Sequence, residues 1–147
     1  MTTMSSRAIR AWFRTFLPAT VPGIPYIETV NIAPNPKNLP DVWATLEFSN
    51  ASEQRLTLGT TAIFREYGMV NVVVLGLSGR GDDGVIEAAE AYRAALQNVS
   101  EQVAVGSEFG TLRIDAAEPP NTDATESGNW FLASVSCSYT FDVVRAA

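Results

Sequence analysis

The closing stretch NWFLASVSCSYTFDVV, residues 129–144, constrains the fold more than any other segment, because apolar and polar side chains alternate along nearly all of it. Alternation with a period of two is typical of a β-strand that buries one face. At about 3.3 Å per residue this strand would extend on the order of 50 Å, more than a compact domain needs. We therefore expect either a bulge that folds it over its own domain or pairing with a neighbouring chain. The predicted apolar face consists of Phe131, Ala133, Val135, Cys137, Tyr139, Phe141 and Val143.

Three further stretches predict strands. DVWATLEFS, residues 41–49, alternates in the same way, and GTLRIDA, residues 110–116, predicts a shorter strand. RLTLGTTAIFREYGMVNVVVLGL, residues 55–77, predicts two strands that turn at Tyr67, Gly68 and Met69, with the glycine supplying the positive φ of a tight turn. This would be the central hairpin of the sheet.

Two stretches predict helices. In SSRAIRAWFRTFL, residues 5–17, apolar residues recur at helical spacing and three arginines fall on the opposite stripe, with Ser5 or Ser6 as the cap. We expect its aromatic face to pack on the sheet; a transit peptide or a membrane-surface helix is the alternative. A second amphipathic helix is expected from about Val85 to Leu96. Its apolar stripe consists of Val85, Ala88, Ala89, Tyr92, Ala95 and Leu96.

The stretch between the first helix and the first strand, residues 18–40, holds six of the eight prolines and predicts an extended arm. Its middle, from Tyr26 to Ile32, could add an edge strand. The polar segment 118–129 predicts an exposed loop. The 147 residues thus predict one α+β domain. It consists of an N-terminal helix (1–17), a Pro-rich arm (18–40) and a mostly antiparallel sheet with the second helix packed on it (41–147).

Composition excludes several classes of function. The chain has no histidine, which removes Ser-His-Asp and Cys-His catalysis and His-containing zinc sites. Its single cysteine, Cys137, lies on an apolar face and is expected to be buried. A net charge of −6 with scattered basic residues gives no footprint for nucleic acid. No apolar run approaches the roughly 20 residues of a membrane span, so we expect a soluble protein. From the missing residue types above, we also expect no enzymatic activity, cofactor or metal.

The segment from Gly79 to Gly84 spells G-x-G-x-x-G between a predicted strand and a predicted helix, as in dinucleotide-binding proteins. Asp82 and Asp83 occupy positions that would face the phosphates, and their carboxylates would repel that anion while capping the helix. An antiparallel hairpin before the loop is also the wrong topology for such a site. The tripeptide Arg80-Gly81-Asp82 likewise spells an adhesion motif without the secretion signal that would accompany it. Nucleotide binding therefore remains only a minor alternative.

The order of these elements resembles the tail terminator, or tail completion, proteins of long-tailed bacteriophages. The resemblance covers nearly the whole chain and is strongest in FREYGMVNVVVLGLSGRGDDGVIEAAEAYRAAL, residues 64–96. There a strand, a turn with Gly68, an apolar strand and a Gly-rich helix entry follow one another as in that family. The family has no catalytic signature and no strict binding motif, so it carries no residue over as a contact.

The resemblance implies a structural virion protein that forms a hexameric ring at the head-proximal end of the tail tube. Such a ring stops tube polymerisation and joins the tail to the neck, after assembly in the host cytoplasm. Its partners would be further copies of itself, the tube protein and a neck protein, while DNA passes through the lumen without specific binding. Another head–tail joining or neck protein is the alternative. Independently of the resemblance, the predicted turn and the Gly79–Gly84 segment are expected to be exposed and able to meet a partner. The candidate contact residues are Tyr67, Gly68, Met69, Arg80, Asp82 and Asp83.

Overall fold

The computed structural model describes residues 6–27, 40–59, 61–77, 83–100, 102–103, 110–122 and 130–146. The elements are two helices and six strands arranged as one α+β fold, which confirms the predicted fold class. In chain order they are α1 (Arg7–Thr20), β1 (Val42–Arg55), β2 (Thr61–Leu77), α2 (Asp83–Gln97), β3 (Gln102–Val103), β4 (Gly110–Ala117), β5 (Asn121–Thr122) and β6 (Trp130–Ala146).

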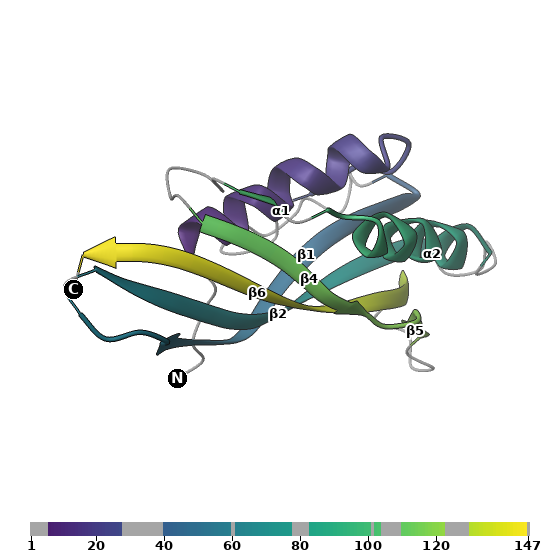
Figure 1. The fold of residues 1–147 in the computed structure, drawn as a ribbon. Helices are drawn as coiled ribbons and strands as arrows, with labels where there is room; N and C mark the ends of the chain where they lie inside the picture. The colour runs from purple at the N-terminus through teal and green to yellow at the C-terminus, as the bar shows by residue number, and fades with distance from the viewer. Residues whose placement is uncertain are drawn as a thin grey trace.

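The sheet has the order β1-β2-β6-β4-β3, and β5 pairs with β6 beside this path. Each pair of neighbouring strands is antiparallel. Both helices lie over the same face of the sheet, so the molecule has one helical layer and one sheet layer (Figure 1). The other face carries no helix among the described residues.

The core lies between these two layers. From α1 it takes one apolar stripe, and α2 supplies a second stripe with small alanines that allow close approach to the sheet. The sheet contributes the even-numbered residues of β2 and the odd-numbered residues of β6, as period-two alternation requires. The buried helical residues are Ile9, Phe13 and Leu17 of α1, and Val85, Ala88, Ala89, Tyr92 and Leu96 of α2.

β6 confirms the predicted closing strand, but neither expected way of covering it applies. Its 17 residues pair with the 17 residues of β2, from Thr61↔Ala146 to Leu77↔Trp130, with no shift in register. The two long, curved strands run side by side along the length of the sheet (Figure 1). The length of β6 is thus satisfied within its own chain, and it is no longer an argument for pairing with a neighbour.

The predicted turn at Tyr67, Gly68 and Met69 is wrong, because β2 runs through these residues as one strand. Gly68 lies opposite Tyr139, and a Cβ atom at Gly68 would overlap the hydroxyl oxygen and ring of Tyr139. The glycine therefore makes room for an aromatic ring on the neighbouring strand and does not turn the chain. The real connection lies earlier, where Gly59 has a φ of 120° between β1 and β2.

The N-terminal helix ends later in the chain than predicted, and its start lacks the predicted side-chain cap. α1 continues through Pro18 to Thr20, so the Pro-rich arm starts inside its last turn. Ser6 occupies the N-cap position, but its side chain makes no capping hydrogen bond. Ser5 lies outside the described residues. Of the predicted edge strand, Tyr26 forms a parallel bridge to Ala44 of β1, and residues 28–39 lie outside the described part.

β1 differs from its prediction in length and in burial. A register shift between Ser49 and Ser52 lets the strand continue beyond residue 49 as far as Arg55. Trp43 and Thr45 alternate with the core residues Ala44 and Leu46 and therefore lie on the other face of β1, yet they are buried too. Both faces of β1 are therefore covered at its start, and only its later part leaves one face exposed.

Candidate functional site

The sheet surface away from the helices is the candidate site, and we call it the open face. It consists of the odd-numbered residues of β2 and the even-numbered residues of β6, with their neighbours on β1 and β4. The described residues contain six exposed large apolar side chains; four of them belong to this face by register, and the other two lie in the β1–β2 connection. They are Ile63, Tyr67, Met69 and Val144 on the face and Leu56 and Leu58 in the connection.

Two of the predicted contact residues, Tyr67 and Met69, lie in the middle of this face. They are 39% and 38% exposed, opposite Thr140 and Ser138 of β6. Aromatic residues and methionine are enriched in the cores of protein interfaces. Both side chains are exposed, as a contact would require, but they lie in a continuous strand and not in the predicted turn.

The other predicted contact residues do not join them. Gly68 lies on the core side of the sheet against the Tyr139 side chain, so it is not available for a contact on the open face. Asp83 is the first residue of α2, while Arg80 and Asp82 lie outside the described residues. The Gly79–Gly84 segment also joins β2 to α2 in a sheet of antiparallel neighbours, which does not provide the parallel βαβ unit of a dinucleotide site.

Two pairs of opposite charges lie on the open face. Arg65 donates from Nε and Nη2 to the two carboxylate oxygens of Asp142, at 2.6 and 2.8 Å. The hydrogen bond from Arg65 lowers the pKa of Asp142, and the same contact raises the pKa of the guanidinium. On the next strand Asp115 accepts a hydrogen bond from Thr140 and lies 3.5 Å from Arg113. Paired charges of this kind can be covered by a partner at a lower desolvation cost than lone charges.

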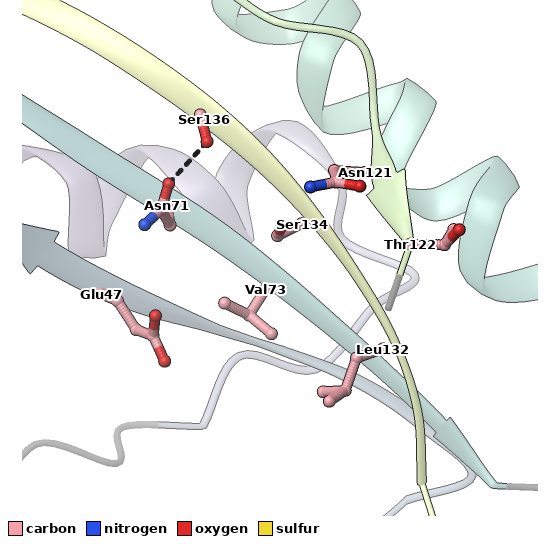
Figure 2. Close-up of a pocket in the computed structure, with 8 residues that line it drawn as sticks. All are labelled: Glu47, Asn71, Val73, Asn121, Thr122, Leu132, Ser134 and Ser136. Carbon is pink, nitrogen blue, oxygen red and sulfur yellow. Dashed lines mark hydrogen bonds between the residues drawn. The ribbon is translucent and has the colours of Figure 1, made fainter. Parts of the chain in front are cut away.

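A shallow groove of about 440 Å³ crosses the part of the open face that includes Asn71 of β2 and Ser134 of β6. Figure 2 shows side chains from β1, β2, β5 and β6 around it, with Ser136 donating to Asn71 at 2.8 Å. Amide, hydroxyl and carboxylate groups alternate there with two aliphatic residues. The lining consists of Glu47, Asn71, Val73, Asn121, Thr122, Leu132, Ser134 and Ser136. This mixture suits a protein surface, since it has apolar contact area between groups that can form hydrogen bonds.

β1, β2 and β6 form a long three-stranded ribbon. The end of this ribbon at which β1 connects to β2 and at which β6 ends forms a second apolar surface, which we call the ribbon tip. It consists of Leu56, Leu58, Ile63 and Val144. Ile63 pairs with Val144, and the Leu56 amide donates to the Ile63 carbonyl at 2.8 Å, so three of these residues are neighbours. Leu58 is 92% exposed and Val144 is 57% exposed. A cluster of this kind is a mark of an interaction site on a soluble protein.

The helical layer carries a separate hollow of about 430 Å³, the helix hollow, between the outer side of α1 and the end of α2. The rings of Trp12 and Phe16 stack there, with centroids 4.7 Å apart. Val99 adds an aliphatic side chain, and Ala19 and Asn98 mark the carboxyl ends of the two helices. Like the ribbon tip, this surface combines apolar groups with free access from solvent.

A buried polar link that sequence reasoning missed connects the sheet to α1. Tyr139 donates from its hydroxyl to Oε2 of Glu66 at 2.5 Å, and the Ser6 amide donates to the same oxygen at 3.2 Å. No acidic residue lies in the first turn of α1, so Glu66 supplies from β2 the negative charge that a helix N-terminus favours. The only signal in the sequence was a lone carboxylate on the apolar face of a strand.

The remaining chemistry in the described residues is sparse. They contain no group of three or more side chains that could hold a metal ion, and no helix among them is both long and apolar enough to cross a membrane. Cys137 is buried as predicted, and burial raises the pKa of its thiol to about 12. A thiol held neutral in this way is a poor nucleophile.

Comparison with known proteins adds no assignment: no protein-family model matches the chain, and no curated protein matches it. The account of function therefore depends on the residues and surfaces described above.

Proposed function

We propose that the chain is a structural subunit of a long-tailed bacteriophage tail, a tail terminator that forms a ring on the head-proximal end of the tube. The ring ends tube polymerisation and joins the tail to the neck. In this role the protein acts through surfaces that bind other proteins, and it needs neither a catalytic group nor a cofactor.

The distribution of exposed apolar side chains is the observation that carries this proposal. The large exposed apolar residues of the described chain gather on the open face and the ribbon tip, and none of them belongs to the helical layer. Tyr67 and Met69 contribute the residue types that interfaces favour, and the charges beside them are already paired. A surface of this composition supports permanent assembly with other protein subunits.

The fold and charge of the chain are compatible with this role. An α+β subunit with an N-terminal helix and a long closing strand is what the resemblance to tail terminators implies, and this fold class is observed. The predicted turn at Gly68 does not contribute, because the strand is continuous there. A net charge of −6 suits a ring through which DNA passes, since an acidic wall repels the phosphate backbone.

Tail length in the absence of this protein tests the proposal. Without a terminator, tube subunits continue to add, so electron micrographs should show tubes of uncontrolled length. Supplying the wild-type protein in trans should restore one defined length. Tubes of normal length that lack only heads would contradict the terminator role and favour another head–tail joining protein. No effect on tails would contradict both.

A further inference from the structure

The ribbon tip and the helix hollow are chemically matched, although they lie on different sides of the molecule. The tip presents Leu58 at 92% exposure, beside the half-exposed Leu56. The hollow offers an aromatic wall made of Trp12 and Phe16, and Val99 adds to its lining. Its volume of about 430 Å³ is large enough for one leucine side chain together with part of a neighbour. An exposed apolar projection and an apolar hollow on the same protein are complementary surfaces for a contact between two copies.

The two surfaces cannot meet within one copy of the chain. Ile63 and Val144 of the tip belong to the open face, whereas the hollow is formed by the helices on the opposite face (Figure 1). The β1–β2 connection, which carries Leu58, lies at the far end of the long ribbon. A second copy is thus required to bring a tip to a hollow.

Charge favours the same pairing. Ala19 and Asn98 place the carboxyl ends of α1 and α2 at the hollow, and neither helix has a basic residue in its last turn. Their macrodipoles therefore leave partial negative charge there. The tip carries Arg55, whose guanidinium is fixed by hydrogen bonds to the carbonyls of Thr57 and Gly59, both at 2.7 Å. A cation beside Leu58 would approach two helix ends that have no basic residue in their last turns.

We propose that the ribbon tip of one copy docks into the helix hollow of the next copy, with Leu58 against Trp12 and Phe16 and Arg55 beside the carboxyl ends of α1 and α2. This rests on the proposed function in one respect, since it supplies the lateral contact of the ring. The contact joins two different surfaces and is heterologous, so repeated rotation can close it into a ring. An isologous dimer would instead bring one surface against itself.

Cross-linking of single-cysteine variants tests this contact. Leu58→Cys and Ala19→Cys are substitutions at exposed positions and should leave the fold intact. The native Cys137 is buried, so it does not compete for the reagent. When the two purified variants are mixed at high concentration and treated with a short bismaleimide, we expect a cross-linked product that joins one chain of each variant through the two introduced thiols. Each variant alone should give no product, and the doubly substituted chain should give a ladder of multimers.

A blocking variant provides the control. Ala19→Arg, added to the chain that offers the hollow, fills this surface and places a positive charge opposite Arg55, while it favours the end of its own helix. Assembly with the wild-type tip should be lost without a lower melting temperature. Glu90→Arg, at an exposed position of α2 outside the hollow lining, should leave assembly unchanged.

The opposite results are equally definite. No product in the mixture, or efficient cross-linking of Leu58→Cys to itself, would overturn the docking contact. That failure differs from a failure of the terminator role, which is read from tail length without this protein and does not depend on the route of lateral contact. A hollow occupied instead by the tube or neck protein would appear as cross-linking of Ala19→Cys to that protein in assembled tails, and would also overturn the contact.

Discussion

The hydroxyl of Tyr139 donates a 2.5 Å hydrogen bond to Oε2 of Glu66 across the core face of the sheet. The ring of Tyr139 packs against Gly68. The Glu66 carboxylate also accepts a hydrogen bond from the amide of Ser6 at the start of α1. One tyrosine therefore fills the space left by a glycine and helps to hold the carboxylate that joins α1 to the sheet. Gly68 makes room for this ring while β2 continues as one strand through Tyr67, Gly68 and Met69.

Tyr139→Phe tests the hydrogen bond to Glu66. The substitution keeps the ring and removes the donor from a buried carboxylate, so we expect a loss of about 1.5–3 kcal/mol in the free energy of unfolding. Tyr92→Phe is the matched control, because the Tyr92 hydroxyl is buried without a hydrogen-bond partner among the described residues. Urea denaturation should show Tyr92→Phe unchanged or more stable. Equal effects of the two substitutions would remove the role given to Glu66.

Gly68→Ala tests the close approach of Tyr139. A Cβ atom would lie within 2.6 Å of three atoms of that side chain, so the ring must shift and we expect destabilisation of about 1–3 kcal/mol. Gly84→Ala in α2 is the control, since a Cβ atom there meets nothing within 4 Å. Thermal unfolding should separate the two variants. A Gly68→Ala protein as stable as wild type would show that the ring does not need the glycine.

The Arg65–Asp142 pair predicts a pH dependence. Because the pKa of Asp142 is lowered in the folded protein, its contribution to stability is present above its unfolded pKa of about 4 and is lost as the pH falls through the folded pKa. Asp142→Asn should therefore be less stable than wild type at pH 7, by about 1 kcal/mol or less for a partly exposed pair. The difference should shrink in urea titrations as the pH is lowered below that value.

The control for this pH dependence is Glu90→Gln, at an exposed position on α2. It should show a smaller change with pH than Asp142→Asn. A wild-type advantage over Asp142→Asn that grows on acidification would contradict the assigned sign.

Tyr67→Ser with Met69→Ser tests the open face as an assembly surface. Both side chains are more than a third exposed, so the double variant should fold, with little change in melting temperature, while losing most of its ability to complete tails. Complementation of tails that lack the wild-type protein measures this. A matched double variant on the exposed side of α2, Glu90→Ser with Ala94→Ser, should complete tails normally. Full activity of the Tyr67/Met69 variant would show that this part of the face meets solvent.

Local patterns in the sequence were sufficient for several elements. Alternation identified β6 and its buried face, and helical spacing identified the buried stripes of α1 and α2, because in both cases the period is set within the segment. Gly68 was misread because a glycine between Tyr67 and Met69 has the composition of a turn. Its actual reason is a ring on β6, far along the chain.

The candidate site was predicted only in part, for a similar reason. Tyr67 and Met69 were expected at the surface as the tip of a hairpin; they are exposed, but as residues of a continuous strand. The ribbon tip was missed, because Ile63 and Val144 have residue types typical of a core, and only the pairing of β2 with β6 brings them together on the face without helices. The helix hollow depends on where α2 ends relative to α1, and no local pattern reports that relation.

A reconstruction of the head-proximal end of the tail by electron microscopy tests the central claim most directly. With the chain docked into the density, the terminator account predicts one hexameric ring that closes the tube, and the purified protein should be a monomer or a hexamer by light scattering. A stable dimer in solution, or density for this chain at the distal tip of the tail, would contradict the account.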